Sequence, residues 1–370
     1  MVEWKTVGDV IEYLPGGALK RSEVMEKRLY PVMNGGVDYS GYYENYNYDE
    51  NVLTISHWGS SASHVHRHFD KFWANNACWV FLPKDNSKCK LEYLYYILKS
   101  REQIMMQTMC FGGATPNLNR SLFEKMPIPI PTLSEQIRIV DILDTFMASI
   151  ENLKQQIEER RKQYEYYRDQ LLDLEGKEGV EMKPLGVIGE FIRGSGIQKA
   201  DFVEIGMPCI HYGQIHTRYG MSATETFSNI DKNLYNKCKK AECGDVVLAT
   251  TSEDAEGCAK PVVWLGNEKV AVSGDAYIYH HNQNGKFMAH QFATHRFLLF
   301  KIMNATGAKV VRISGENMAK YEIALPSLEE QNRIVSILDT FEAIIANLEA
   351  QLEQREKQYE YYRNKLLTFE

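Results

Sequence analysis

Residues 131–175 read PTLSEQIRIVDILDTFMASIENLKQQIEERRKQYEYYRDQLLDLE, and residues 326–370 read PSLEEQNRIVSILDTFEAIIANLEAQLEQREKQYEYYRNKLLTFE. Roughly two-thirds of the positions are identical at one fixed offset, far beyond chance, so the two stretches form an internal repeat. Pro131 and Pro326 stand just before the expected helix starts, where a proline is tolerated, and acidic residues follow in the first turn. Each copy therefore predicts one long helix.

A seam of apolar and aromatic residues runs along each predicted helix. Its members step alternately by four and three, which is the spacing of a left-handed coiled coil. Arg160 and Arg355 take one step in each copy. In the first copy the other seam residues are Ile139, Leu143, Phe146, Ile150, Leu153, Ile157, Tyr164, Tyr167 and Leu171. In the second copy they are Ile334, Leu338, Phe341, Ile345, Leu348, Leu352, Tyr359, Tyr362 and Leu366.

The chain between the helices indicates how they pair. One segment joins the end of the first helix, near Glu175, to the start of the second, near Pro326. If this segment folds compactly with its ends close together, the second helix runs back along the first. We therefore expect an antiparallel pair with one globular block at each end. A parallel coiled coil between two copies of the chain is the alternative, because a seam alone does not fix its partner.

The rest of the chain forms two globular blocks that share one plan. The start of the first block, VEWKTVGDVIEYLPGG, aligns with VEMKPLGVIGEFIRGSG from Val180 onward. Further landmarks follow in the same order: a matching stretch, a strand, a helix and a last short strand. In the first block they are Tyr30–Gly36, Ala77–Phe81, Leu91–Lys99 and Met126–Ile130. In the second they are Met207–Gly213, Ala276–His280, Phe287–Ile302 and Tyr321–Leu325.

This order predicts an α+β protein in four parts. The parts are a globular block at 1–130, a long helix at 131–176, a second globular block at 177–325 and a second long helix at 326–370. Two similar blocks at opposite ends of an antiparallel pair are related by a pseudo-two-fold axis, and two-fold proteins read two half-sites of DNA. Because the blocks differ in sequence, the half-sites would differ too, giving a bipartite, asymmetric target.

Composition narrows the class of protein. The odd number of cysteines, seven, without framework spacing, favours reduced thiols in the cytoplasm. The sequence has no apolar run of about 18 residues and no signal-like N-terminus, so we expect a soluble protein without a membrane partner. The net charge of −7 lies on the helices, since residues 1–130 carry 14 basic and 14 acidic residues and residues 176–325 carry 17 and 16. Acidic helices repel DNA phosphates and suit protein partners, whereas neutral blocks leave room for basic patches.

The chain resembles the specificity subunits of type I restriction–modification systems. The resemblance rests on the doubled P-x-L-x-E-Q-x-x-I-V-x-I-L openings at Pro131–Leu143 and Pro326–Leu338, their long helices, and the two alternating blocks. It covers essentially the whole chain and implies two target recognition domains that bind double-stranded DNA. It also implies a non-catalytic subunit without a cofactor, which binds two methyltransferase subunits and, through them, restriction subunits.

Loops rich in amides, aromatics and basic side chains are the candidates for DNA contact. Arginine favours guanine, and asparagine or glutamine favours adenine, while phosphate contacts come from many polar groups. The candidates in the first block are Lys20, Arg21, Asn34, Tyr39, Tyr42, Tyr43, Asn45, His57 and Arg67. Those in the second block are Gln198, Lys199, His211, Tyr212, Gln214, His216, Arg218, Tyr219 and Thr251.

Other interpretations stay open at this stage. His64, His66 and His68 alternate, so on a strand they would share a face and could hold a metal ion, although no carboxylate or cysteine stands at ligand spacing nearby. Ser252–Glu256 with Lys260 faintly resembles a set of nuclease carboxylates, but a polar loop is the simpler interpretation. We find no phosphate or dinucleotide loop. A coiled-coil scaffold with two binding heads and no nucleic acid is the main alternative function.

The helices are also expected to act as a ruler. A seam of about 33 residues spans roughly 50 Å at 1.5 Å per residue. The reading heads should lie somewhat closer together than that, near one turn of B-DNA, which is about 34–36 Å. The sequence therefore predicts two half-sites on the same face of the duplex, separated by several unspecified base pairs.

Overall fold

The computed structural model describes residues 2–307 and 310–369, and the chain forms two compact units. Unit 1 comprises residues 1–154 and 350–370, and unit 2 comprises residues 155–349. The boundary falls within both long helices, α5 (Leu133–Leu172) and α12 (Leu328–Leu367). Each unit therefore contains one globular block together with one end of each long helix.

Unit 1 begins with sixteen short elements before α5. They are β1 (Glu3–Thr6), α1 (Val7–Val10), β2 (Ile11–Leu14), the 3-10 helix η1 (Arg21–Glu23), β3 (Tyr30–Met33), β4 (Tyr42–Tyr43), β5 (Val52–Ser56), β6 (Val65–His68), β7 (Trp73–Ala74), β8 (Cys78–Pro83), α2 (Leu91–Lys99), α3 (Glu102–Met109), β9 (Cys110–Phe111), β10 (Asn117–Leu118), α4 (Arg120–Lys125) and β11 (Pro127–Ile130).

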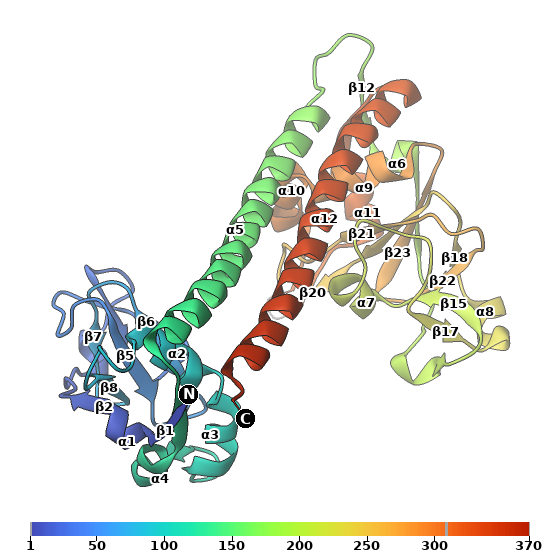
Figure 1. The fold of residues 1–370 in the computed structure, drawn as a ribbon. Helices are drawn as coiled ribbons and strands as arrows, with labels where there is room; N and C mark the ends of the chain where they lie inside the picture. Colours follow the sequence, from blue (N-terminus) through green and yellow to red (C-terminus); the bar gives the residue numbers. More distant parts are fainter. Residues whose placement is uncertain (1, 308–309, 370) are drawn as a thin grey trace. The chain divides into compact units, whose positions relative to one another are not determined.

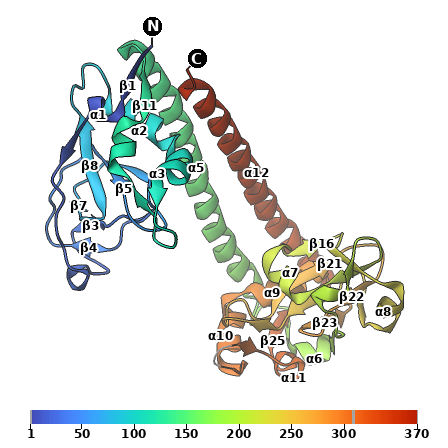
Figure 2. The same ribbon diagram turned by 90° about the horizontal axis from the view of Figure 1, so that it is seen from below.

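The core of unit 1 lies between an antiparallel sheet and helices. The sheet has the strand order β2-β8-β5-β6, and a small sheet, β4-β3-β7, adjoins it. Helix α2 carries its apolar residues on one broad side, as expected for a helix packed against a core. Figure 2 shows α2 between the sheet and α5, and the buried side chains of all three form one cluster. The expected strand and helix at 77–81 and 91–99 are confirmed as β8 and α2.

Unit 2 begins and ends with a similar order but has additional helices and strands in its middle. Its elements before α12 are β12 (Glu181–Pro184), α6 (Leu185–Ile188), β13 (Gly189–Arg193), the 3-10 helix η2 (Lys199–Asp201), β14 (Phe202–Val203), β15 (Met207–Ile210), α7 (Tyr212–Thr217), β16 (Ser222–Ala223), β17 (Ser228–Ile230), α8 (Lys232–Lys237), β18 (Lys240–Ala241), β19 (Val246–Ala249), β20 (Thr251–Ser252), β21 (Lys260–Trp264), β22 (Val270–Val272), β23 (Ala276–His281), α9 (Gly285–Ala293), α10 (His295–Asn304), β24 (Val311–Arg312), α11 (Gly315–Ala319) and β25 (Glu322–Leu325).

One expectation for unit 2 is wrong: the helix predicted at Phe287–Ile302 is two helices, α9 and α10. The break falls at Thr294, whose backbone is extended (φ −69°, ψ 153°). Its hydroxyl donates to the Gln291 carbonyl and accepts from the Phe297 amide, so one side chain ends the first helix and caps the second. The core strands of the unit follow the order β13-β23-β19-β21-β16, with α9 packed against β21.

The long helices pair in opposite directions within each unit, which confirms the antiparallel expectation (Figure 1). In unit 1 the rings of Phe146 and Tyr362 stack with centroids 5.3 Å apart. In unit 2 the matching rings of Tyr167 and Phe341 stack at 5.5 Å. Lys154 follows Phe146 on α5, whereas Glu356, its ion-pair partner, precedes Tyr362 on α12, so the two helices run in opposite directions. The repeat therefore places the same aromatic stack in both units.

Part of the predicted seam belongs to the globular cores. Ile139 and Leu143 are fully buried in the core of unit 1, and Ile334 and Leu338 are fully buried in the core of unit 2. The far ends of the helices join these cores as well: Leu367 lies in that of unit 1, and Leu172 in that of unit 2. A seam by itself does not distinguish a helix partner from a sheet partner, because both pack against the same apolar stripe.

A buried glutamine fixes the start of each long helix. Gln136 is fully buried, and its amide oxygen accepts from the Lys90 amide at 2.8 Å. Its amide nitrogen donates to the carbonyls of Lys88 and Pro131. Gln331 does the same in unit 2, with the Asn284 amide and the Pro326 carbonyl among its partners. Lys90 and Asn284 are the residues that precede α2 and α9, so each glutamine ties a long helix to the first core helix of its unit.

The alternating histidines His64, His66 and His68, at and just before β6, form a packed polar face in unit 1. His68 is buried, with Nε2 at 2.8 Å from the Thr54 hydroxyl and Nδ1 at 3.1 Å from the Tyr39 hydroxyl. His66 donates through Nε2 to the Gly36 carbonyl, and His64 lies beside Glu102. Burial lowers the pKa of His68 to about 3 and that of His66 to about 4. Both imidazoles are therefore neutral at pH 7.

Among the described residues, no helix combines the length and the apolar character that crossing a lipid bilayer requires.

Replacing Gln136 with leucine should destabilise unit 1 by about 2–4 kcal/mol, since the Lys90 amide and two carbonyls would lose their buried partner. Urea unfolding measures the loss, and faster hydrogen exchange of the Lys90 amide localises it. Gln155→Leu, at an exposed position of the same helix, is the control and should change stability by less than about 0.5 kcal/mol. Equal stability of the two variants would contradict the role of the buried amide.

Acid should destabilise unit 1 through its histidines. The folded pKa values lie below the ordinary value of 6.5, so the unfolded chain binds more protons between about pH 6.5 and pH 3–4. The contribution of the two neutral imidazoles to the unfolding free energy is fully present above pH 6.5. It falls as the pH falls, by about 2 kcal/mol per ring at pH 5. His68→Gln should therefore flatten the dependence of unfolding free energy on pH. An unaltered slope in His68→Gln would refute the assignment.

Candidate nucleic-acid interface

Three of the predicted DNA-contacting residues of unit 1 line one hollow. Lys20, Asn34 and His57 come from three separate loops and surround a space of about 500 Å³, together with Trp58 and Asn76. The His57 ring is held in place, since Nε2 donates to the Asn76 carbonyl at 2.8 Å and the ring stacks on Trp79. Lys20 and Asn34 are exposed, so their polar ends are free to meet a ligand.

Two of the predicted residues of unit 2 line a similar hollow. Gln198 and Tyr212 surround a space of about 370 Å³ with Arg193, Ser273 and Asp275. The Arg193 guanidinium is positioned by a bond from Nε to the Gly274 carbonyl at 3.0 Å. The Tyr212 amide donates to the Ser273 hydroxyl, which fixes the start of α7 against the wall of the hollow.

The two hollows occupy the same position in the two units. In unit 1 the wall is formed where Gly17 bridges Asn75 in parallel, and in unit 2 where Ser195 bridges Ser273 in parallel. Each bridge leads into a 3-10 helix, η1 or η2, that starts directly after Lys20 or Gln198. Close backbone approach is required here, because a Cβ on Gly194 would lie 2.2 Å from the Ser273 carbonyl oxygen.

The hollows differ in chemistry although they share a position. The hollow of unit 1 offers a lysine, the amides of Asn34 and Asn76, and an imidazole. The hollow of unit 2 offers a glutamine amide, a carboxylate from Asp275, a phenol and a guanidinium. Amides pair with adenine, cationic side chains with guanine, and a carboxylate accepts from cytosine. The pair is thus suited to read two different short sequences.

A second hollow adjoins the first in unit 1 and was missed by sequence reasoning. His57 lies between the two, and the second is lined by Trp79, Phe111, Asn117 and Arg120. Trp58 and Phe111 are 58% and 57% exposed beside these hollows. An aromatic residue in a sequence is most often part of a core, so only the folded loops reveal that these two face the solvent.

The same pair of loops recurs in unit 2. Trp58 is bridged to Asn117 in unit 1, and Thr251 is paired with Arg312 in unit 2. Thr251 was a predicted contact, whereas Arg312, which is exposed, was not. His216 joins this group, because Nε2 donates to the Thr251 carbonyl at 3.0 Å.

Several other candidates of unit 1 serve packing. Tyr43 meets Trp73 edge to face, and Tyr39 contacts His68. Arg67 forms an ion pair with Glu92 at 3.1 Å, with little of its side chain exposed. The remaining candidates, Arg21, Tyr42 and Asn45, are exposed and line neither of the two hollows described for this unit.

The remaining candidates of unit 2 are similarly divided. His211 is buried and caps α7 through the Gly213 amide, and Tyr219 is 5% exposed with its hydroxyl accepting from the Phe227 amide. Gln214 donates to the Ser228 hydroxyl at 2.7 Å. Arg218 lies over the Phe227 ring and is exposed, as is Lys199 on η2. The sequence could not distinguish these roles, because they depend on which loops lie next to one another in the folded unit.

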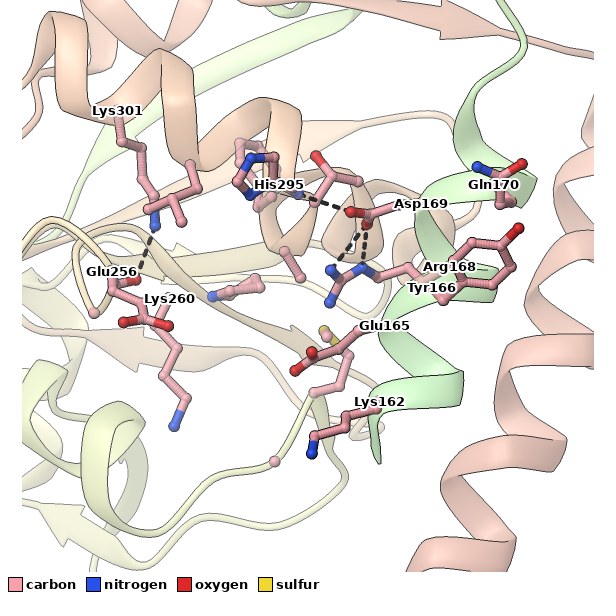
Figure 3. Close-up of a pocket in the computed structure, with 18 of the residues that line it drawn as sticks. Lys162, Glu165, Tyr166, Arg168, Asp169, Gln170, Glu256, Lys260, His295 and Lys301 are labelled. Atoms are coloured by element: carbon pink, nitrogen blue, oxygen red, sulfur yellow. Dashed lines mark hydrogen bonds and ion pairs between the residues drawn. The ribbon is translucent and has the colours of Figure 1, made fainter. Parts of the chain in front are cut away.

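A larger hollow of about 930 Å³ in unit 2 lies between the end of α5 and the globular block (Figure 3). Most of its charged side chains form ion pairs or hydrogen bonds with neighbouring residues of unit 2. Arg168 and Asp169 form an ion pair at 2.9 Å, and Asp169 also accepts from the His295 amide. Lys301 is buried and donates to the carbonyls of Glu256 and Cys258. Of the predicted contacts, this hollow includes Tyr219 alone.

Several of the residues considered for a metal or catalytic site make structural contacts. Among the described residues, no group of three or more His, Cys, Asp or Glu side chains could hold a metal ion. The histidine nitrogens of β6 are engaged in the packed face of unit 1. In the acidic loop of unit 2, the Asp254 carboxylate accepts from the Gly257 amide and so supports a turn.

Curated proteins similar to this chain are specificity subunits. A putative type I restriction enzyme specificity subunit of Haemophilus influenzae is 27% identical, over 100% of this chain and 96% of that protein. The EcoR124I/EcoR124II specificity subunit of Escherichia coli is 28% identical, over 100% of this chain and 94% of that protein.

Solved structures and a family model agree with these relatives. The fold resembles the crystal structure of a type I restriction–modification S subunit from M. genitalium, with a TM-score of 0.65 and 16% identity over 100% of this chain and 97% of that one. The model of the type I restriction modification DNA specificity domain matches residues 1–160 and again residues 177–355. The chain belongs to the family of type I restriction–modification DNA specificity domains.

Proposed function

We propose that each unit reads one half of a bipartite, asymmetric DNA target for a type I restriction–modification enzyme. The observation that carries this proposal is the pair of hollows, which hold the same position in the two units but differ in their polar side chains. A duplicated protein that read one repeated sequence would need the same chemistry twice. Different chemistry at matching positions fits two different half-sites.

The side chains suggest how the half-sites are read. Lys20 is suited to guanine, and Asn34 and Asn76 to adenine, in the half read by unit 1. Gln198 is suited to adenine, and Asp275 to cytosine, in the half read by unit 2. Exposed cations such as Arg21, Lys199 and Arg312 would position the phosphate backbone without specifying sequence.

Partner subunits supply the chemistry in this proposal. The E. coli relative is named as the specificity subunit of a restriction enzyme, which is one part of a larger assembly. We propose that this chain likewise directs methyltransferase subunits, and restriction subunits through them, to the target. The long helices would set the number of base pairs between the half-sites, because a continuous helix is a stiff spacer.

A repeated surface stripe supports a proposed binding site for two copies of one partner. On α5 it consists of Glu158, Lys162 and Tyr166, and on α12 of Glu353, Lys357 and Tyr361. The Glu–Lys ion pairs are both 2.5 Å long, and Tyr166 and Tyr361 are 62% and 59% exposed.

Solvent-facing positions tolerate most substitutions, and exposed neighbours have indeed diverged, as at Glu151 and Ala346. An identical stripe on both helices therefore suits two identical protein subunits. Exposed tyrosines are frequent anchors in such interfaces. A scaffold without nucleic acid would use the same stripe, but it gives no reason for two matched hollows with different polar side chains.

Exchanging the reading residues should alter one half-site at a time. In the assembled enzyme, Lys20→Gln should change methylation at one or two positions of one half-site, and Gln198→Lys should change the other half. Each exchange should lower methylation of the parental site by about tenfold, as expected for losing one good base contact. Methylome sequencing of a host expressing each variant gives both halves directly.

Lys27→Gln, at an exposed lysine outside the described hollow, is the control and should keep the parental target. The purified chain alone, given methyl donor and DNA, should transfer no methyl groups. If one exchange altered both halves together, independent reading by the two units would be wrong.

Removing the tyrosines of the stripe should reduce loading of the methyltransferase. Tyr166→Ala or Tyr361→Ala should each weaken one of two sites by about 2 kcal/mol or more, and the double variant should weaken both. Native mass spectrometry of the mixture reports the ratio of subunits. Glu151→Ala, which gives α5 the residue that α12 already has at Ala346, should load normally. Normal loading by the double variant would exclude the stripe as the docking site.

A further inference from the structure

We propose that Trp58 stacks against a base step in the half-site read by unit 1, and that Phe111 supports it from the neighbouring loop. The matching position in unit 2 is Thr251, so the two half-sites would be distorted to different extents. This inference rests on the proposed DNA-reading function and adds a contact that works through base stacking, not hydrogen bonding.

The exposure of Trp58 is unusual for its residue type. It is more exposed than the other four tryptophans of the chain, of which Trp264 is 2% exposed and Trp4 is 49% exposed. An indole ring is large and mostly apolar, so leaving it in water forgoes a substantial gain from burial. Phe111 is also 57% exposed, across the hollow that begins at His57. Two exposed aromatic rings beside two adjoining polar hollows indicate a surface that is covered during function.

The loop presents the indole on a fixed backbone. The Leu118 amide donates to the His57 carbonyl and the Gly59 amide to the Pro116 carbonyl, both at 2.9 Å. These bonds close a two-sided bridge around Trp58. The His57 ring next to it is itself held by its bond to the Asn76 carbonyl. Trp58 is therefore exposed on a loop whose backbone is already fixed. Such a loop loses little conformational entropy when its side chain enters a base stack.

The surroundings favour nucleic acid over protein as the occupant. Lys20 lies in the hollow on one side of the loop and Arg120 in the hollow on the other, so cations flank the exposed rings. Asparagine amides, including Asn34 and Asn117, complete both hollows. Cations for phosphates, amides for base edges and an aromatic face for a base form the combination by which proteins hold DNA and unstack its steps. In a protein–protein interface, the same ring would lie in an apolar core that is depleted of charged residues.

The test uses the full chain assembled with its methyltransferase subunits and a duplex carrying the methylome-derived target. Trp58→Ala should weaken binding to this duplex by about tenfold, as for loss of one aromatic–base stack. Trp58→Phe, which keeps a ring, should restore most of the affinity. Trp4→Ala, at the other strongly exposed tryptophan of unit 1, is the matched control and should bind like the wild type.

A second measurement locates the contact. With 2-aminopurine placed at successive positions, unstacking in the half-site of unit 1 should produce a fluorescence rise that Trp58→Ala abolishes. A signal from a base flipped by the methyltransferase would persist in that variant. Trp4→Ala should leave the pattern in both halves unchanged.

Two results would overturn the inference. One is wild-type affinity in Trp58→Ala. The other is a loss of affinity that is explained entirely by failure to bind the methyltransferase, seen by native mass spectrometry, which would make Trp58 a protein contact. If the wild-type assembly itself bound no bipartite duplex, the proposed function would fail, and not only the role of Trp58.

Discussion

A buried amide at the start of each long helix is the constraint on which the rest of the structure depends. Gln136 and Gln331 are fully buried, and each satisfies a backbone amide and a proline carbonyl from two different segments. Leaving such groups unpaired would cost more than the bonds themselves contribute, so the angle between each long helix and its core helix has little freedom. Each junction therefore joins the start of one long helix to the globular core of its unit.

The repeat made much of the fold predictable. A shared order of landmarks indicated two similar blocks, and the bounds of α2 follow directly from an apolar pattern between a polar turn and a Gly-containing loop. The break at Thr294 escaped the same reasoning, because the residues on both sides keep a helical pattern and a single hydroxyl interrupts it. The seam indicated an apolar stripe but not the partners of its residues, since Ile139 lies in the core of unit 1 together with Leu367 of α12.

The candidate interface was less predictable, for a physical reason. Lys20, Asn34 and His57 meet only because the register of two sheets brings three loops together. A polar residue in a loop reads the same in sequence whether it caps a helix, as His211 does, or faces an open hollow, as Gln198 does. Trp58 is the clearest omission, since composition assigns a tryptophan to the interior and only the pairing of its loop places it outside.

The closing turns of α12 have a consequence for how the chain is made. Leu367 is buried in the core of unit 1, with Tyr359 and Phe369 packed beside it, whereas unit 2 is drawn from one uninterrupted segment, residues 155–349. A ribosome therefore begins unit 1 first but releases the α12 residues that contribute to its core only after all of unit 2, so unit 2 can finish folding before unit 1 does. A nascent chain that stopped at Glu349 would retain an intact second unit and an incomplete first core, and quality-control proteases would recognise that open core.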